Sequence, residues 1–298
     1  MIKPQIIIGA SGLIGGYILK TLIQSGVQAS GTYRSQYLEG LFQLDIRNPD
    51  EVNRFFQLYE PAVVYLPAAS ANVDWCELHR EEAYKTNVIG LSHVIHAINH
   101  VCAKLVYFSS DYVFDGKSGP YQEEDLPNPI CEYGKQKLIA EHCIATQAHD
   151  FLIIRTTGVY GIELQKKNFI YRLVDFLKTN REIEVPVDQV GTPTYAPNLA
   201  QAVIELVKQD RSGLYHVSGS KVANRYEFAT AAAKAFNLDY KLIKPELTSR
   251  LDQVAQRPLN GGLIAEKVSK ELSFPLVDFL HGLQALAQGF IPVDDIEI

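Results

Sequence analysis

The stretch that decides the fold is residues 5–24, QIIIGASGLIGGYILKTLIQ. Its first four residues form an almost wholly apolar, β-branched run, as in a strand of a parallel sheet covered on both faces. Glycines then follow in the spacing G-x-x-G-x-x-G, and residues 17–24 have the periodicity of an amphipathic helix. Such glycines let the backbone turn tightly and approach a pyrophosphate, whose charge rests on the N-terminus of the helix. The strand and helix on either side favour a dinucleotide site over an ordinary tight turn. We expect the site to include Gly9, Ser11, Gly12, Leu13, Ile14 and Gly15.

Strand and helix patterns alternate further along the chain. Short apolar runs at 62–66 and 104–108 precede helical stretches at 76–100 and 129–146, and a further strand is expected at 151–155. Such alternation implies a parallel sheet with right-handed crossovers. The sequence therefore predicts an α/β fold with a Rossmann-type, doubly wound parallel sheet. After residue 155 the order is less regular, with helix signals at 169–178, 198–208 and 225–236.

The second predicted strand, residues 27–32, carries information about the type of dinucleotide. It should end beside the adenosine ribose, where an NAD site places a carboxylate. This chain reads Thr32, Tyr33, Arg34 and has no acid there. An arginine can hold a 2′-phosphate through bidentate hydrogen bonds, so we expect NADPH to be preferred over NADH, although Arg34 could also be a solvated loop residue. Asp45 and Ile46 are candidates for the adenine edge or for an ordinary strand end.

Tyr133 and Lys137 lie four residues apart in EYGKQK. At that spacing two side chains share one face of a helix. We expect the Lys137 ammonium to lower the pKa of the Tyr133 phenol from about 10, because a nearby positive charge favours the phenolate. A phenol tuned in this way could transfer a proton near neutral pH. The pattern Y-x-x-x-K is common on helix surfaces, so its significance depends on the glycine loop upstream.

Several motifs together carry a family resemblance. GASGLIG, LDIRNPDEV, LPAASANVDWCE, SSDYVFDG, YGKQK, VDQVGTPTYAPNLA and RPLNGG occur in this order. The set resembles the extended short-chain dehydrogenase/reductase family and, within it, the dTDP-4-dehydrorhamnose reductases, which reduce the 4-keto group of a nucleotide-linked deoxysugar. The resemblance covers nearly the whole chain. It implies that Tyr133 donates a proton, that Lys137 holds the nicotinamide ribose and stabilises the phenolate, and that Ser110 orients the carbonyl.

The resemblance also implies binding residues. It places Ala68 and Ala69 against NADP(H), where small side chains leave room, although two alanines alone would indicate close helix packing; Ser109, Tyr133 and Lys137 complete this set. Residues 1–155 would form the NADP-binding domain with the catalytic residues. Residues 156–298 would form mainly a smaller substrate-binding lobe, partly interleaved with the first domain. The residues implied for the nucleotide-sugar substrate are Val73, Asp74, Asp111, Gln189, Thr192, Arg257 and Asn260.

Two features separate the chain from the resembled reductases. Their members usually carry a tryptophan after the strand at 151–155, where this chain reads Thr156, Thr157, Gly158, so the sugar pocket is expected to differ and the hexose stays open. The glutamates that bind an intersubunit magnesium in some members do not align here. We therefore predict no metal, and we expect the histidines at 93, 96 and 100 to be packing residues on one helix.

Composition sets outer limits on function. The net charge of −6 and the pI near 5.8 argue against a nucleic-acid surface. No long apolar run or signal peptide is evident, which predicts a cytoplasmic protein without a membrane partner. The four cysteines form no C-x-x-C pair and are expected to be reduced thiols. Paired long helices often build dimers in the resembled family, so a homodimer is an open expectation.

Two other functions compete with a reductase. The chain also resembles the β subunit of methionine adenosyltransferase through SSDYVFDG and the acidic PYQEED after it, which would make it a non-catalytic, NADP-binding regulatory subunit. The third alternative is a sugar-nucleotide epimerase or dehydratase of the same fold. Dehydratases of this type need an extra acid beside the serine. Asp111 has a suggestive position, but Tyr112 stands where their adjacent glutamate would be.

Overall fold

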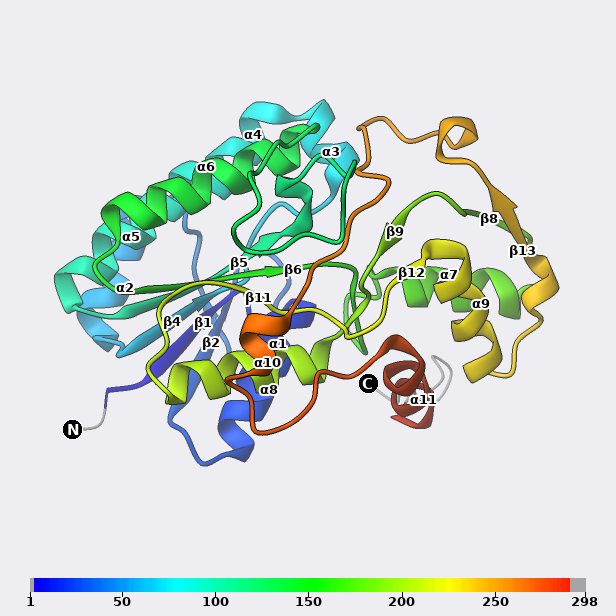
Figure 1. The fold of residues 1–298 in the computed structure, drawn as a ribbon. Coiled ribbons are helices and arrows are strands. Elements are labelled where there is room, and N and C mark those ends of the chain that lie inside the picture. Colours follow the sequence, from blue (N-terminus) through cyan, green and yellow to red (C-terminus); the bar gives the residue numbers. More distant parts are fainter. Residues whose placement is uncertain (1–2, 290–298) are drawn as a thin grey trace.

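A computed structural model describes residues 3–289 of the chain. Its central sheet has seven parallel strands in the order β11-β6-β5-β4-β1-β2-β3 (Figure 1). The strand order reverses at β1, because β2 and β3 lie on one side of it and β4, β5 and β6 lie on the other. Such a switch point creates a crevice at the carboxyl ends of the strands, where sheets of this kind bind ligands. The predicted Rossmann-type α/β class is confirmed. The strands are β1 (Gln5–Ile8), β2 (Ala29–Tyr33), β3 (Phe42–Gln43), β4 (Val63–Leu66), β5 (Lys104–Ser110), β6 (Phe151–Thr156) and β11 (Gly213–His216).

Helices cover both faces of this sheet. Strand residues alternate between them: Ile6 and Ile8 pack toward one face and Ile7 toward the other. The first face is covered by α2 (Pro49–Tyr59), α5 (Gly90–Val101) and α6 (Glu132–Gln147), and the second by α1 (Leu13–Gln24) and α8 (Ala196–Lys208), with α10 (Glu266–Ser269) beside β11. Because both faces are buried, the strands read as continuous apolar runs.

The long helix expected at 76–100 is wrong in detail. The structure divides this stretch into α3 (Val73–Leu78), α4 (Arg80–Tyr84), the π-helical η1 (Lys85–Ile89) and α5. His79 interrupts the helix with φ −126° and ψ 57°. In the π-helical turn, the side chain of Asn87 accepts from Ser70 N at 2.8 Å and donates to Gln136 Oε1 at 2.9 Å. The wide turn thus places a buried amide between the loop after β4 and helix α6.

A second core lies beside the carboxyl ends of the sheet strands (Figure 1). There β8 (Ile183–Pro186) pairs in parallel with β13 (Ile243–Glu246). The predicted helices at 169–178 and 225–236 are found as α7 (Phe169–Lys178) and α9 (Arg225–Ala235), which pack with α11 (Phe279–Gly289). The third predicted helix, at 198–208, is α8 on the main sheet.

Two elements from the second half of the chain belong to the main sheet and the helices that cover it. β11 and α8 come from the second half, yet β11 pairs with β6 and α8 packs against α1. The expected division at residue 155 falls inside β6, and it stays a prediction. The remaining elements are η2 (Asp111–Val113), β7 (Val159–Tyr160), β9 (Val190–Gly191), β10 (Thr194–Tyr195), β12 (Ala223–Asn224), η3 (Tyr240–Leu242) and η4 (Thr248–Arg250).

Candidate active site

The glycine loop joins β1 to α1 in a turn that larger residues would not fit. Gly9 has φ +95°, and a Cβ there would lie 2.9 Å from the Cβ of Ala68. A Cβ on Gly15 would lie 2.4 Å from the carbonyl oxygen of Gly9. These contacts explain the first and third glycines of the motif. They also place Ala68, which follows β4, directly against the loop; its predicted contact with the cofactor stays a prediction.

The start of α1 suits the diphosphate of a dinucleotide. Gly12 is its N-cap and makes no side-chain capping bond, and the first turn has no acidic residue. Backbone N–H groups at a helix start need acceptors, and the helix dipole favours a negative charge there. The residues at the start of α1 therefore fit a bound diphosphate. A residue from the second half of the chain also contacts the loop, because Gln165 Nε2 donates to the carbonyl oxygen of Ser11 at 2.9 Å.

The carboxyl end of β2 is a basic edge. Arg34 is exposed directly after the strand. Asp45 accepts from Arg47 and forms an ion pair with it at 2.5 Å, which lowers the pKa of its carboxyl. Ile46 is buried, and His93 Nδ1 lies 2.9 Å from its carbonyl oxygen. Asp45 and Ile46 thus form a fixed rim next to Arg34. Arg47 was not predicted, although a second arginine two residues after Asp45 was a visible signal.

The three predicted catalytic residues meet where β5 ends. Lys137 Nζ donates to Phe108 O at 2.7 Å and to the Tyr107 hydroxyl at 3.1 Å, and it lies 5.8 Å from the ring centroid of Tyr133. Ser110 Oγ donates to Asp111 Oδ1 at 3.1 Å, and Ser110 also takes part in a side-chain hydrogen bond with Tyr133. All three predicted residues are buried. Helix α6 therefore places a phenol and an ammonium beside the serine.

The expected direction of the Tyr133 pKa shift is wrong. Burial raises this pKa above its ordinary value, and the hydrogen bond with Ser110 only partly opposes the effect. The phenolate would lose its hydration at this depth, and that loss outweighs the nearby ammonium. Burial also lowers the pKa of Lys137 to about 8. Tyr133 is consequently protonated at neutral pH, which is the state needed to donate a proton.

Asp111 fixes the loop after β5. Its carboxylate accepts from Thr157 Oγ1 at 2.7 Å and from Ser110 Oγ, and burial raises its pKa. These bonds make Asp111 a loop-fixing acceptor, and its predicted contact with a substrate stays a prediction. Gly158, which follows Thr157, has φ +52°. A left-handed backbone strains a residue with a side chain, which gives a local reason why no tryptophan occupies this position.

Two of the predicted substrate residues pair with each other. Arg257 Nη2 donates to Asp74 Oδ2 at 2.7 Å, and Ala255 N donates to Asp74 Oδ1 at 2.9 Å. Val73 packs against the cluster that contains Tyr133. The contacts bring the start of α3 and the late R-P-x-N segment close to Tyr133. Their contact with a substrate stays a prediction.

Three further substrate candidates hold loops together. Gln189 Nε2 donates to Thr248 Oγ1 at 3.0 Å and to Gln253 Oε1 at 2.9 Å. Thr192 Oγ1 accepts from Leu263 N at 3.1 Å, and Asn260 Nδ2 donates to Gly119 O at 3.0 Å. These bonds tie the 189–192 segment to the late loop. Their predicted role toward a substrate is not tested by these contacts.

A buried ionic network lies next to the predicted catalytic residues. Arg155 of β6 forms an ion pair with Glu141 of α6 at 2.6 Å, and their side chains are only 4% and 8% exposed. Ser109 Oγ also donates to Glu141. On the other side, Arg155 Nη1 lies 3.5 Å from His216 Nε2. Ser109, expected against the cofactor, is thus also part of this network.

His216 should make stability depend on pH. Burial lowers its pKa to about 3, so the native chain stays unprotonated there while the unfolded chain takes up a proton near pH 6.5. Stability should therefore fall as the pH falls through that window, by about 2 kcal/mol between pH 7 and pH 5 from this residue. Urea unfolding at both pH values should show that His216→Gln, which keeps a donor and an acceptor, loses about 2 kcal/mol less. If His216→Gln lost as much unfolding free energy between pH 7 and pH 5 as the original chain, the result would contradict this prediction.

The family follows from comparison with known proteins. A family model described as the RmlD substrate binding domain matches residues 5–291. The chain belongs to this family. A dTDP-4-dehydrorhamnose reductase from Aggregatibacter actinomycetemcomitans is 30% identical over 291 residues, which are 94% of this chain and 96% of that protein. The predicted resemblance is thereby confirmed, and the predicted class, an NADP-dependent oxidoreductase of sugar nucleotides, agrees with the family.

Two more relatives of this RmlD-family chain bear on its function. The crystal structure of dTDP-4-dehydrorhamnose reductase from Bacillus anthracis str. Ames in complex with NADP has a TM-score of 0.88 and 29% identity, and covers 97% of this chain and 100% of that one. Methionine adenosyltransferase 2 subunit beta from Xenopus tropicalis is 31% identical over 275 residues, covering 90% of this chain and 82% of that protein. The family thus includes relatives with different names.

Arg225 is a site candidate that sequence reasoning missed. It begins α9 of the RmlD-family lobe and interacts electrostatically with Tyr112, with Arg257 and Arg172, and with the buried Asp111. Among residues 3–289 it has no salt-bridge partner, and burial lowers its pKa. A cation next to two other arginines favours an anion. The only sequence signal was a basic residue at the start of a predicted helix.

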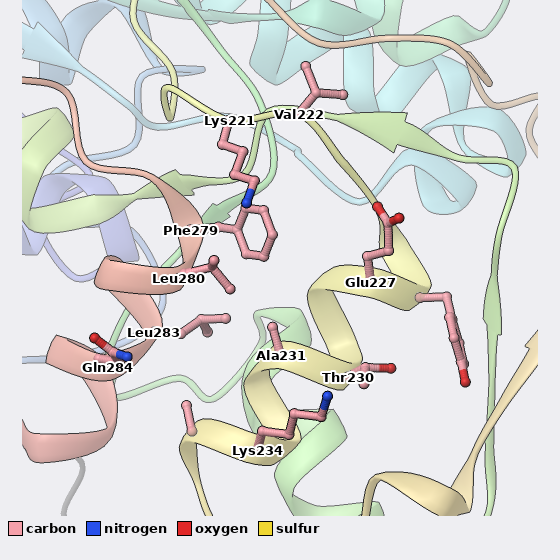
Figure 2. A pocket seen from close by; sticks show the side chains of 12 residues that line it. Lys221, Val222, Glu227, Thr230, Ala231, Lys234, Phe279, Leu280, Leu283 and Gln284 are labelled. Atoms are coloured by element: carbon pink, nitrogen blue, oxygen red, sulfur yellow. The ribbon is translucent and has the colours of Figure 1, made fainter.

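A hollow in the RmlD-family lobe lies apart from this site. Figure 2 shows Phe279 and Leu283 of α11 facing Ala231 and Lys234 of α9 across it. Its volume is about 660 Å³, and none of the predicted site residues lines it. Within residues 3–289, no helix is long and apolar enough to cross a membrane and no His, Cys, Asp and Glu cluster could hold a metal ion. The described cysteines are all free.

Proposed function

We propose that this chain uses NADPH to reduce the 4-keto group of a nucleotide-linked deoxysugar. The observation that carries the proposal is the buried meeting of Ser110, Tyr133 and Lys137 at the carboxyl end of β5. The glycine loop lies at the same edge of the sheet, after β1. A phenol that burial keeps protonated suits the reduction of a ketone.

The cofactor would be held by groups already described. The start of α1 would take its diphosphate, and Arg34 would take the 2′-phosphate. Asp45 and Ile46 would border the adenine, while Ala68 and Ala69 would leave room beside the loop. When bound, NADPH supplies the hydride. Lys137 would bind the ribose hydroxyls next to the nicotinamide.

The chain's own residues would complete the proton transfer. Ser110 Oγ would turn its single O–H from Asp111 Oδ1 to the ketone oxygen and so hold that oxygen near Tyr133. The Tyr133 hydroxyl would give its proton to that oxygen, which becomes the product hydroxyl. The Lys137 ammonium would stabilise the phenolate that remains, and solvent would return a proton to it.

Arginines would recognise the rest of the substrate. Arg257 and Arg225 lie close enough to interact beside Tyr112 and Asp111. Two guanidinium groups can bind the oxygens of a diphosphate, each through two hydrogen bonds. Gln189, Thr192 and Asn260 would shape the wall of this region. The resembled reductases usually carry a tryptophan in the segment that contains Gly158 here, so we do not assign the hexose of the substrate.

NADPH oxidation with a panel of 4-keto nucleotide sugars tests the proposal. We expect turnover with at least one deoxysugar of the panel. Tight NADPH binding without turnover would favour the regulatory alternative. The similarity to the Xenopus tropicalis subunit is the reason for testing that alternative. A reaction that leaves NADPH unchanged but alters the sugar would favour an epimerase or dehydratase. We also propose a cytoplasmic location and a homodimer.

Cofactor preference gives a separate prediction. Arg34→Ala should weaken NADPH binding about tenfold or more and leave NADH binding unchanged, because charge-assisted hydrogen bonds to the 2′-phosphate contribute about 1.5–3 kcal/mol. Fluorescence titrations with both cofactors measure this. Arg181→Ala, exposed on the lobe, is a control that should leave the ratio unchanged. Equal loss for NADPH and NADH would show that Arg34 does not read the phosphate.

A further inference from the structure

Helix α6 carries a third functional-looking side chain one turn beyond Lys137. Tyr133, Lys137 and Glu141 follow each other at intervals of four residues on its buried face. The Glu141 carboxylate accepts from Arg155 Nε at 2.9 Å, from Arg155 Nη2 at 2.6 Å and from Ser109 Oγ. Its orientation is therefore fixed by donors from two neighbouring strands.

The groups around Lys137 identify Glu141 as the source of negative charge. Tyr107 on β5 and Tyr133 on α6 are phenols whose pKa values burial raises, and Cys76 on α3 is a thiol whose pKa burial raises to about 11. All three are neutral near pH 7. The hydrogen-bond acceptors of the ammonium, Phe108 O and Tyr107 OH, are neutral too. Glu141 opposes the burial effect on Lys137.

The far side of the network keeps Arg155 in place. His216 Nδ1 lies 3.1 Å from the carbonyl oxygen of Tyr121 and must donate to it. The other ring nitrogen then accepts from Arg155 Nη1 at 3.5 Å, which is consistent with a neutral histidine. The Arg155 guanidinium also lies 5.0 Å from the ring centroid of Phe114. Arg155 thus directs the Nε and Nη2 edge toward Glu141.

We propose that Glu141 is a positioning residue of the reaction, whose carboxylate, fixed by Arg155 and Ser109, keeps the Lys137 ammonium charged beside Tyr133. The inference deepens the proposed function, since it assumes that Lys137 serves catalysis. Burial alone would favour the neutral amine and leave the phenolate formed by proton donation without its counter-charge. Glu141 acts through Lys137 and touches neither substrate nor cofactor.

The test is a pH titration of Lys137 observed by NMR in protein labelled with ¹³C at lysine Cε. The resonance missing from a Lys137→Met variant assigns the signal. Glu141→Gln should lower the titration midpoint of Lys137 by about one pH unit, because an adjacent opposite charge shifts a pKa by that order. Glu141→Asp, which keeps the charge, should restore most of the difference. An unchanged midpoint in folded Glu141→Gln protein would overturn the proposal.

Matched variants separate this effect from a loss of structure. Glu184→Gln, at an exposed position of β8, should leave the Lys137 midpoint unchanged. If Glu141→Gln alone does not fold, Glu141→Gln combined with Arg155→Met removes both charges of the pair, and the midpoint should again fall; an unchanged midpoint there would also overturn the proposal. The titration needs no substrate. Absence of NADPH oxidation would therefore refute the proposed function without changing this result.

Discussion

Tyr133→Phe is expected to lower kcat for ketone reduction by about 100- to 10,000-fold, the usual range for losing a general acid. The substitution removes only the hydroxyl that would protonate the ketone oxygen. The ring still packs in the cluster with Val73 and Cys76, so the fold and NADPH binding should be retained. Steady-state kinetics and an NADPH titration on the same protein measure both quantities.

A second tyrosine provides the matched control. The hydroxyl of Tyr65 donates to Gln5 Oε1 at 2.9 Å, and Gln5 begins β1, away from the carboxyl ends of the strands. Tyr65→Phe also removes a buried hydroxyl and should leave kcat within a few-fold of the original. If Tyr133→Phe keeps full turnover, Tyr133 is not the acid.

Arg155→Met is expected to destabilise the chain by about 3–5 kcal/mol, because it leaves Glu141 charged, buried and unpaired. Urea unfolding at neutral pH measures this. Replacing both partners, with Glu141→Leu and Arg155→Met together, should recover most of the loss, since apolar pairs of similar volume often replace buried ion pairs without cost. A loss below about 1 kcal/mol in the single variant would show that water or another group compensates Glu141.

The first strand and helix of the fold follow closely from local patterns. β1 has the predicted bounds of Gln5–Ile8. Helix α1 begins at Leu13, four residues before the expected start, because the last glycine of the motif lies inside the helix and the middle one, Gly12, is its N-cap. Periodicity detects the apolar face of a helix, but it does not detect a first turn made of small residues.

The helix between β4 and β5 shows what periodicity misses. Its apolar pattern continues through His79, where the backbone leaves the helical region. Asn72 caps α3 by accepting from Trp75 N at 2.9 Å, which starts a separate helix before the predicted one. A cap can be read from sequence, but the buried amide contacts of Asn87 depend on a loop and a helix, α6, that the sheet brings together.

The site was predictable as a set of residues and less so as an electrostatic environment. The spacing of Tyr133 and Lys137 was sufficient to place them on one helix face. The direction of the Tyr133 pKa shift was not predictable, because the depth of burial depends on residues such as Ala255, more than a hundred positions away. Glu141 and Arg155 were missed too, because the packing of α6 against β5 and β6 brings them together.

Transfer of deuterium from NADPH that carries deuterium at both C4 positions of the nicotinamide tests the central claim most directly. The chain would be mixed with the labelled cofactor and a 4-keto nucleotide sugar that it turns over, and the product examined by NMR. We predict that the product carries deuterium on C4 of the sugar. With Tyr133→Phe, no deuterated product should be detected after the same reaction time. A product without deuterium, or labelled cofactor that binds but is never oxidised by any sugar of the panel, would contradict a reductase.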